Sequence, residues 1–89
     1  MESNKSKTSR RKPALTSTRE LLAINTKLLR ALRGLTQEGL AEKAGKDRSV
    51  IIRIEGQRQN LTLDSVDDLA RALGVEVEEL FRKRDALGR

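Results

Sequence analysis

The chain of 89 residues contains no cysteine and no histidine. Without cysteine there is no disulfide and no thiolate nucleophile, and without histidine there is no imidazole base. The usual sets of zinc ligands are excluded with them. Adjacent carboxylates such as Glu78 and Glu79 point to different sides of a helix, so they make no credible acid–base pair. We therefore expect neither an enzyme nor a bound metal or cofactor.

Aromatic residues are almost absent, and Phe81 is the single example. Proteins that bind single strands or RNA loops stack bases on several aromatic rings, and this chain has no such platform. No apolar run approaches the roughly 18 residues of a membrane span, and the basic N-terminus lacks the apolar segment of a secretory signal. We expect a cytoplasmic protein without a membrane partner, associated with the nucleoid if it binds DNA.

Positive charge is concentrated in two regions of the sequence. Residues 1–20 hold six Lys/Arg against two Asp/Glu, and residues 25–60 hold eight against four. Residues 61–81 reverse this balance with one basic and six acidic side chains. A basic half backed by an acidic half suits a domain that meets phosphate with one face. Chance clustering on a solvated surface is the alternative.

The sequence divides into an arm, one domain and a tail. Residues 1–17 are polar, basic and rich in Ser and Thr, which predicts a disordered arm. Three roles stay open for it: following the DNA backbone or minor groove, docking a protein partner, or solubilising the chain. Residues 18–81 form the predicted domain, and residues 82–89 form a basic tail. A chain this short favours a compact helical bundle with one small core.

Hydrophobic spacing and boundary residues predict five helices and no strand. The first covers about residues 18–33, although Asn25 and Thr26 are a weak point at which it could instead begin. The others are expected over residues 37–44, 48–55, about 62–73 and 76–81. The predicted N-terminal caps are Ser17, Thr36, Asp47 and either Thr62 or Asp64. The residues predicted to end helices are Gly34, Gly45, Gly56 and Gly74.

The stretch from Thr36 to Glu55 contains two of these helices joined by a tight turn. Ala41 is small enough to let the next helix cross close by, and Gly45 supplies the positive φ of a sharp turn. At 3.6 residues per turn, one side of the second helix carries Val50, Ile51 and Ile54. This apolar side predicts how the helix is anchored on the bundle.

The opposite side of that helix carries Arg48, Ser49, Ile52 and Arg53. Arginine pairs bidentately with guanine O6 and N7, serine reaches a base or a phosphate, and isoleucine packs on a thymine methyl. Either arginine could equally hold a phosphate, and one exposed isoleucine is ordinary. Asp47 could accept from cytosine N4, but a capping role is the more economical interpretation. The pattern favours a helix that enters the major groove.

Residues from about 25 to 81 resemble the helix-turn-helix family of phage repressors and Cro proteins, the lambda repressor-like proteins. The matching pattern is LRALRGLTQEGLAEKAGKDRSVIIRIEGQRQNLTLDSVDDLARALGVEVEEL. The resemblance implies an all-α, compact five-helix domain. The base-reading positions that it implies are Asp47, Arg48, Ser49, Ile52 and Arg53. It also implies a structural ion pair between Arg30 and Glu55.

The resemblance also implies a contact to DNA phosphate at Gln37, where the family has a glutamine that opens the second helix, and we expect further phosphate contacts at Lys46 and Arg58. Lys46 departs from the family pattern, which usually has an apolar residue after the turn glycine. Gly39 departs from it too, because an acidic residue is usual there. Neither departure removes a base-reading position.

Within the family, EGQRQNLTLDSVDDLARALGV resembles restriction–modification controller proteins, with a phage-type repressor or a plasmid or antitoxin regulator as alternatives. We expect a homodimeric transcriptional regulator on a pseudo-palindromic operator. Its dimer interface is predicted at Leu73, Val75, Val77, Leu80 and Phe81, although core packing competes for the same residues. The alternative function is a protein-interaction module, an antitoxin or adaptor, built on the same scaffold.

Overall fold

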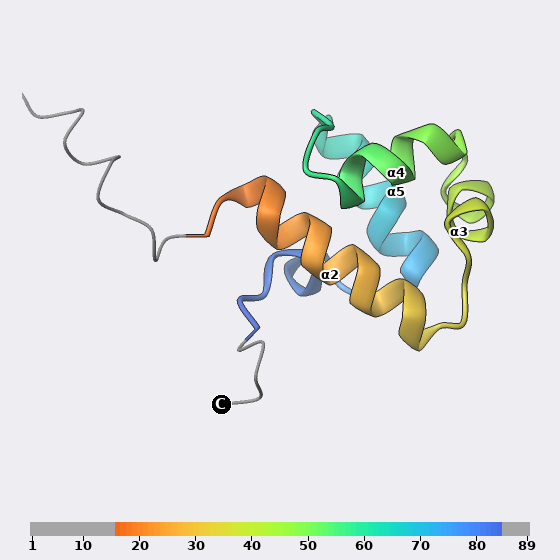
Figure 1. The fold of residues 1–89 in the computed structure, drawn as a ribbon. Coiled ribbons are helices and arrows are strands. Elements are labelled where there is room, and N and C mark those ends of the chain that lie inside the picture. Colours follow the sequence, from red (N-terminus) through yellow and green to blue (C-terminus); the bar gives the residue numbers. More distant parts are fainter. Residues whose placement is uncertain (1–15, 85–89) are drawn as a thin grey trace, which may run out of the picture.

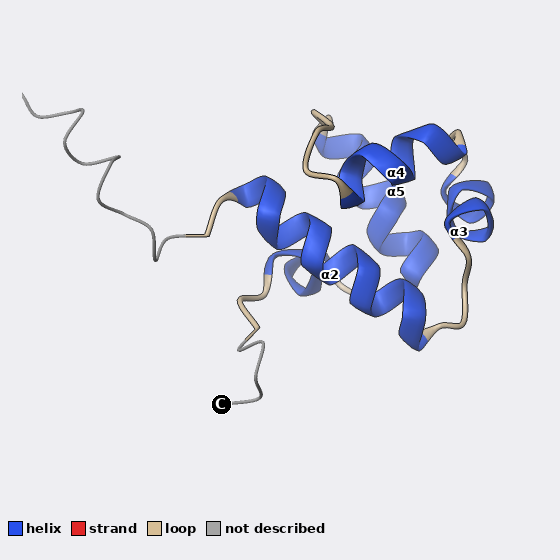
Figure 2. Cartoon of the chain, in the orientation of Figure 1, coloured by secondary structure: helices blue, strands red, loops and turns tan. Residues whose placement is uncertain are grey.

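Four α-helices and one 3₁₀ turn make up residues 16–84, the part of the chain that the computed structural model describes (Figure 1). They are α2 (Thr18–Leu32), α3 (Gln37–Ala44), α4 (Arg48–Glu55), α5 (Leu63–Leu73) and η1 (Val77–Phe81). No strand occurs between residues 16 and 84 (Figure 2), and the all-helical class is confirmed there. The predicted fifth α-helix is corrected to the five-residue 3₁₀ segment η1.

Hydroxyl side chains cap three of the helices. In each case the side-chain oxygen accepts from the backbone N–H three residues further on, at 2.9–3.1 Å: Ser17, Thr36 and Thr62. Each bond satisfies one of the N–H groups that the first turn of a helix leaves unpaired. The cap of α5 is therefore Thr62 and not Asp64. Ser17, the last residue of the predicted arm, is the N-terminal cap of α2.

Asp47 precedes α4 with an extended backbone, but its side chain makes no capping hydrogen bond. The N–H of Val50, which a capping carboxylate would take, donates instead to the backbone oxygen of Asp47 at 3.0 Å. The predicted capping role of the Asp47 side chain is therefore wrong. Its carboxylate is exposed at the start of α4.

All four α-helices end in a hydrogen-bonded turn that contains one residue of positive φ. For three of them this residue is a predicted glycine: Gly34, Gly45 and Gly74. After α4 it is Gln57, with φ of 63°, whereas Gly56 has φ of −96°. The N–H of Gln57 donates to Ile54 O at 3.1 Å, and the N–H of Arg58 donates to Arg53 O at 2.8 Å. These bonds hold a non-glycine residue in a conformation that costs about 1–2 kcal/mol.

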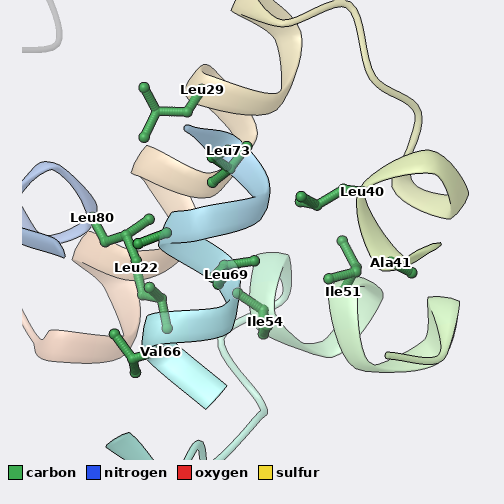
Figure 3. Packing of buried hydrophobic residues seen from close by; sticks show 11 residues of the cluster. Leu22, Leu29, Leu40, Ala41, Ile51, Ile54, Val66, Leu69, Leu73 and Leu80 are labelled. Atoms are coloured by element: carbon green, nitrogen blue, oxygen red, sulfur yellow. The ribbon is translucent and has the colours of Figure 1, made fainter. Parts of the chain in front are cut away.

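The core lies between α2, α5 and the α3–α4 pair, as the side chains in Figure 3 show. Its fully buried large apolar residues are Leu40, Ile51, Leu69, Leu73 and Leu80. Burying one leucine side chain contributes about 1.5–3 kcal/mol to stability, so packing against the core stabilises each helix. Leu40 and Ile51 fix the α3–α4 pair on the rest of the bundle, which positions the outer face of α4.

Asn25 and Thr26 lie in the middle of α2 and are fully buried, so the expected weak point is not a helix boundary. Asn25 Nδ2 lies 2.9 Å from the backbone oxygens of both Leu80 and Arg82, to which it donates. The Arg84 guanidinium donates to Asn25 Oδ1. Burial and these partners explain why a residue with low helix propensity occupies the centre of α2.

Residues 82–84, the first part of the predicted tail, are held against η1. Arg82 and Arg84 both pair with the Glu79 carboxylate, at 2.5 and 3.2 Å. The hydrogen bond from Arg82, followed by its positive charge and that of Arg84, holds the pKa of Glu79 below its usual value. The remaining tail and residues 1–15 of the predicted arm lie outside the described residues.

Candidate nucleic-acid interface

The α3–α4 pair, joined at Gly45, forms the predicted two-helix unit (Figure 1). The N–H of Lys46 donates to Ala41 O at 2.8 Å, which closes the turn, and the buried Ala41 leaves room for α4. On α4, Ile51 and Ile54 are buried and Val50 packs against the core. The predicted inner side of α4 is therefore confirmed.

The opposite side of α4 is directed outward. Arg48 and Ser49 are exposed, and within residues 16–84 neither side chain makes a hydrogen bond. Ile52 and Arg53 are half-buried. The structure thus places the four predicted base-reading residues of α4 on one surface, with Asp47 exposed just before them. This surface offers two guanidinium groups, one hydroxyl and one branched apolar side chain.

Arg53 differs from Arg48 because a neighbouring side chain holds it. Arg53 Nε donates to Gln59 Oε1 at 2.7 Å. Gln59 was not among the residues predicted for the site. No signal in the sequence points to it, because the chain reverses there through Gln57, a residue type that rarely marks such a turn.

The predicted ion pair forms and joins α2 to the end of α4. Arg30 Nε and Nη2 donate to Glu55 Oε2 and Oε1 at 2.8 and 3.0 Å, and Nη1 donates to Leu35 O at 3.0 Å. The side chains are 22% and 6% exposed. The hydrogen bonds to Glu55 raise the pKa of Arg30, against the opposing effect of burial. Arg30 therefore stays charged, and the bidentate pair fixes the orientation of α4.

Gln37, a predicted phosphate contact, joins the same cluster. Its Nε2 donates to Glu55 Oε1 at 3.1 Å. Within residues 16–84, one amide proton and the amide oxygen of Gln37 remain for another partner. Gln37 begins α3 and lies at its positive end, where an anion is favoured.

Lys46, another predicted phosphate contact, has a partner inside the domain. Lys46 Nζ bonds Asp68 Oδ2 on α5 at 3.0 Å, and Arg71 bonds the other oxygen of the same carboxylate at 3.2 Å. The hydrogen bond from Lys46, with that from Arg71 next, lowers the pKa of Asp68. Lys46 thus ties the turn of the two-helix unit to α5, and it can meet phosphate only by sharing or leaving Asp68.

Arg58 is exposed in the loop after α4. Its guanidinium packs over Gly56: a Cβ atom added at Gly56 would lie 3.4 Å from Arg58 Cζ and 3.3 Å from Ile52 O. A side chain at Gly56 would therefore be tightly packed against the end of α4, whereas the φ angle of Gly56 does not itself demand glycine. The absence of a side chain there lets Arg58 lie back along the end of α4.

The predicted dimer residues separate into two groups. Leu73 and Leu80 are 1% and 0% exposed, so they belong to the core of the folded chain and not to its surface. Val75 and Phe81 are half-buried, and Val77 is exposed. The most exposed large apolar residue of the described chain is Leu63, at 83%.

The profile of the family described as Helix-turn-helix matches residues 27–80, more than half of the chain. The chain belongs to the helix-turn-helix family. The match covers the Arg30–Glu55 pair, both helices of the unit and the loop that follows them.

Comparisons with individual proteins support this family assignment. A hypothetical transcription factor of Neisseria meningitidis is 38% identical over 63 residues, 71% of this chain and 59% of that protein. Control protein C.SmaI of Serratia marcescens is 36% identical over 66 residues, 74% of this chain and 79% of that protein. The structure of the restriction–modification controller protein C.AhdI from Aeromonas hydrophila superposes with a TM-score of 0.66 at 38% identity, covering 68% and 92% of the two chains.

These relatives are named as transcription factors and controller proteins and not as enzymes. The resemblance to controller proteins noted in the sequence is therefore confirmed. Among the helices of residues 16–84, none is long and apolar enough to cross a bilayer.

Proposed function

We propose that this helix-turn-helix protein is a transcriptional regulator that binds double-stranded DNA sequence-specifically, with α4 in the major groove. The observation that carries this is the division of α4 into an inner side with Ile51 and Ile54 and an outer side with two arginines. A helix anchored in this way presents its base-reading side chains on a rigid element.

Each outer residue has a proposed role. Arg48 and Arg53 pair with guanine edges, Ser49 bonds a base or phosphate, and Ile52 packs on a thymine methyl. The exposed carboxylate of Asp47, which makes no capping bond, accepts from cytosine N4. The proposed phosphate contacts are Gln37, Arg58 and, when it is shared with Asp68, Lys46.

The regulator acts as a homodimer on a pseudo-palindromic operator. Two recognition helices about 34 Å apart require the two-fold axis to lie beyond one end of α4. A groove of about 340 Å³ lies past its C-terminal end, lined by the loop residues Gln59 and Asn60 and by apolar side chains that include Leu63 and Phe81. We place the dimer surface at this groove. Of the residues predicted for the dimer interface, Phe81 lines the groove and keeps its predicted role.

The test of DNA recognition is selection of bound duplexes from a random library with the full chain. The expected result is a pseudo-palindrome with half-sites about one helical turn apart. Arg48→Ala then weakens the selected site by about 1–3 kcal/mol and relaxes preference at one base position. Lys27→Ala, which removes one exposed charge from α2, is the matched control and leaves base preference intact. Binding without sequence preference, or no binding, would favour the protein-interaction module instead.

The dimer surface has its own test. In sedimentation equilibrium, Leu63→Asp is expected to shift the protein toward monomer, because the charge would be desolvated in the apolar contact. Leu32→Asp is the control, since Leu32 is 66% exposed on α2 and away from the groove. A Leu63→Asp protein that stays dimeric, or a Leu32→Asp protein that dissociates, would place the interface elsewhere.

A further inference from the structure

A line of hydrogen bonds connects the proposed DNA-facing surface of α4 to the start of α2. Arg53 Nε donates to Gln59 Oε1 at 2.7 Å, and Gln59 Nε2 donates to Asn60 O at 3.1 Å. The Arg19 guanidinium then donates to Asn60 Oδ1. Residues from α4, the following loop and α2 thus share one network, and Gln59 is the member that touches the recognition helix.

The chemistry of these groups fixes the orientation of the Gln59 amide. Arginine Nε can only donate, so the atom of Gln59 that faces it must be the oxygen. The amide nitrogen is then directed to the Asn60 carbonyl, which can only accept. Because the amide oxygen accepts from Arg53 and the amide nitrogen donates to Asn60, a flip of the Gln59 amide would break both hydrogen bonds. Gln59 therefore holds the Arg53 side chain in one orientation.

This orientation determines which edge of Arg53 is available to DNA. With Nε occupied by Gln59, the edge that still presents two parallel N–H groups is the one formed by Nη1 and Nη2. That edge matches guanine O6 and N7. Arg48 has no such partner within residues 16–84, so no hydrogen bond in that part of the chain fixes the orientation of its guanidinium before binding.

The loop backbone is built to keep Gln59 in place. The N–H of Arg58 returns to Arg53 O at 2.8 Å, which brings the following residue back beside α4. This requires a positive φ at Gln57, a strained position for a residue with a side chain. The chain therefore keeps a costly turn directly after α4, at the point where the residue that orients Arg53 is located.

We propose that Gln59 is a positioning residue that sets the base preference of Arg53, with a guanine edge in the major groove as the ligand. The proposal rests on the proposed function, since it assigns a second residue to the same DNA-binding surface. Gln59 itself contacts Arg53 and need not contact DNA. Its effect is to restrict, before binding, the rotamers that Arg53 would otherwise lose on binding.

The experiment uses the full chain and two duplexes: the selected site, and the same site with the base pair read by Arg53 replaced. Gln59→Ala is expected to bind the selected site about three- to tenfold more weakly and the replaced site almost as tightly as before. In an Arg53→Ala background, Gln59→Ala is expected to have no further effect on either duplex. Gln59→Glu keeps the acceptor and retains the base preference, while its charge weakens both duplexes.

Two further variants complete the design. Lys27→Ala, which changes an exposed residue outside this network, is the control, with base preference unchanged. Gln59→Met keeps the length of the side chain without the acceptor, so it replaces Gln59→Ala if that variant unfolds, as judged by circular dichroism.

The outcomes separate the two claims. Equal weakening of both duplexes by Gln59→Ala or Gln59→Met, or a full effect in the Arg53→Ala background, would overturn the positioning role and leave a structural one. A wild-type protein that selects no sequence would overturn the proposed function itself, whatever the behaviour of Gln59.

Discussion

The two ends of α4 are built differently. At its start, the Asp47 side chain makes no capping bond and Arg48 makes no side-chain hydrogen bond within residues 16–84. At its end, Glu55 is bound by Arg30 and Gln37, and Arg53 is bound by Gln59. One short helix thus combines an adaptable end with a preorganised end. We expect the first to tolerate variation in DNA and the second to demand a particular base.

The largest expected contrast between the two ends is in stability. Glu55→Ala leaves the Arg30 guanidinium without its carboxylate, and losing one partner of a buried pair costs about 3–5 kcal/mol. Because the Arg30 side chain keeps 22% exposure, we expect a loss near 3 kcal/mol in the free energy of unfolding. Urea denaturation followed by circular dichroism measures it.

Asp47→Ala is the matched control at the other end, because it removes one carboxylate directly before α4. Without a capping bond, its expected effect is within about 0.5 kcal/mol, compared with about 1 kcal/mol for a typical cap. Equal losses for the two variants would show that the ends of α4 are not as different as the hydrogen bonds indicate.

A contrast of intermediate size concerns the turns before and after α4. Gly45 and Gln57 both have positive φ, at 70° and 63°. Gln57→Gly is expected to stabilise the fold by about 0.5–1 kcal/mol through relief of strain. Gly45→Ala is expected to destabilise it by about 1–2 kcal/mol through φ alone, since no atom lies within 4 Å of the added methyl. Thermal melts of both variants check the opposite signs, and a destabilised Gln57→Gly protein would mean that its side chain supports the loop.

The smallest expected effect on stability is at the hydrogen bond between Lys46 and Asp68, which joins the turn before α4 to α5. Asp68 has a lowered pKa in the folded state, so its contribution to stability is present above its usual value of 3.8 and is lost as the pH falls through the lowered value. Wild type and Asp68→Asn should therefore differ most near pH 7 and least near about pH 3. Urea titrations at both pH values measure this. A difference that grows on acidification would contradict it.

Local rules predicted most of the fold. Ser17, Thr36 and Thr62 cap helices because a short hydroxyl reaches only the nearest N–H groups, and three glycines end helices because they adopt positive φ. The predictions are wrong where contacts between residues far apart in the sequence override local propensity. Asn25 is poor in a helix by propensity, yet it is held there by carbonyls more than fifty residues away. The last α-helix becomes a 3₁₀ turn where Leu80 enters the core.

The candidate site was predictable to the same extent. The two faces of α4 follow from a period of 3.6 residues, and Arg30 and Glu55 follow from the family pattern. The pairing of Lys46 with Asp68 joins residues 22 apart and leaves no mark in the sequence. Gln59 was missed for another reason: its place beside Arg53 depends on a left-handed turn at a residue that seldom forms one.

The buried amide of Asn25 also bears on how the domain is made. It joins the centre of α2 to Leu80 and Arg82, residues 55 and 57 positions later in the chain. During synthesis α2 emerges before this segment, and until the segment arrives the Asn25 amide has only its local bond to Leu21 O within the helix. The nascent chain therefore completes its core only after Arg82 has left the ribosome. Until then the two-helix unit lacks the platform that makes its outer face a rigid surface.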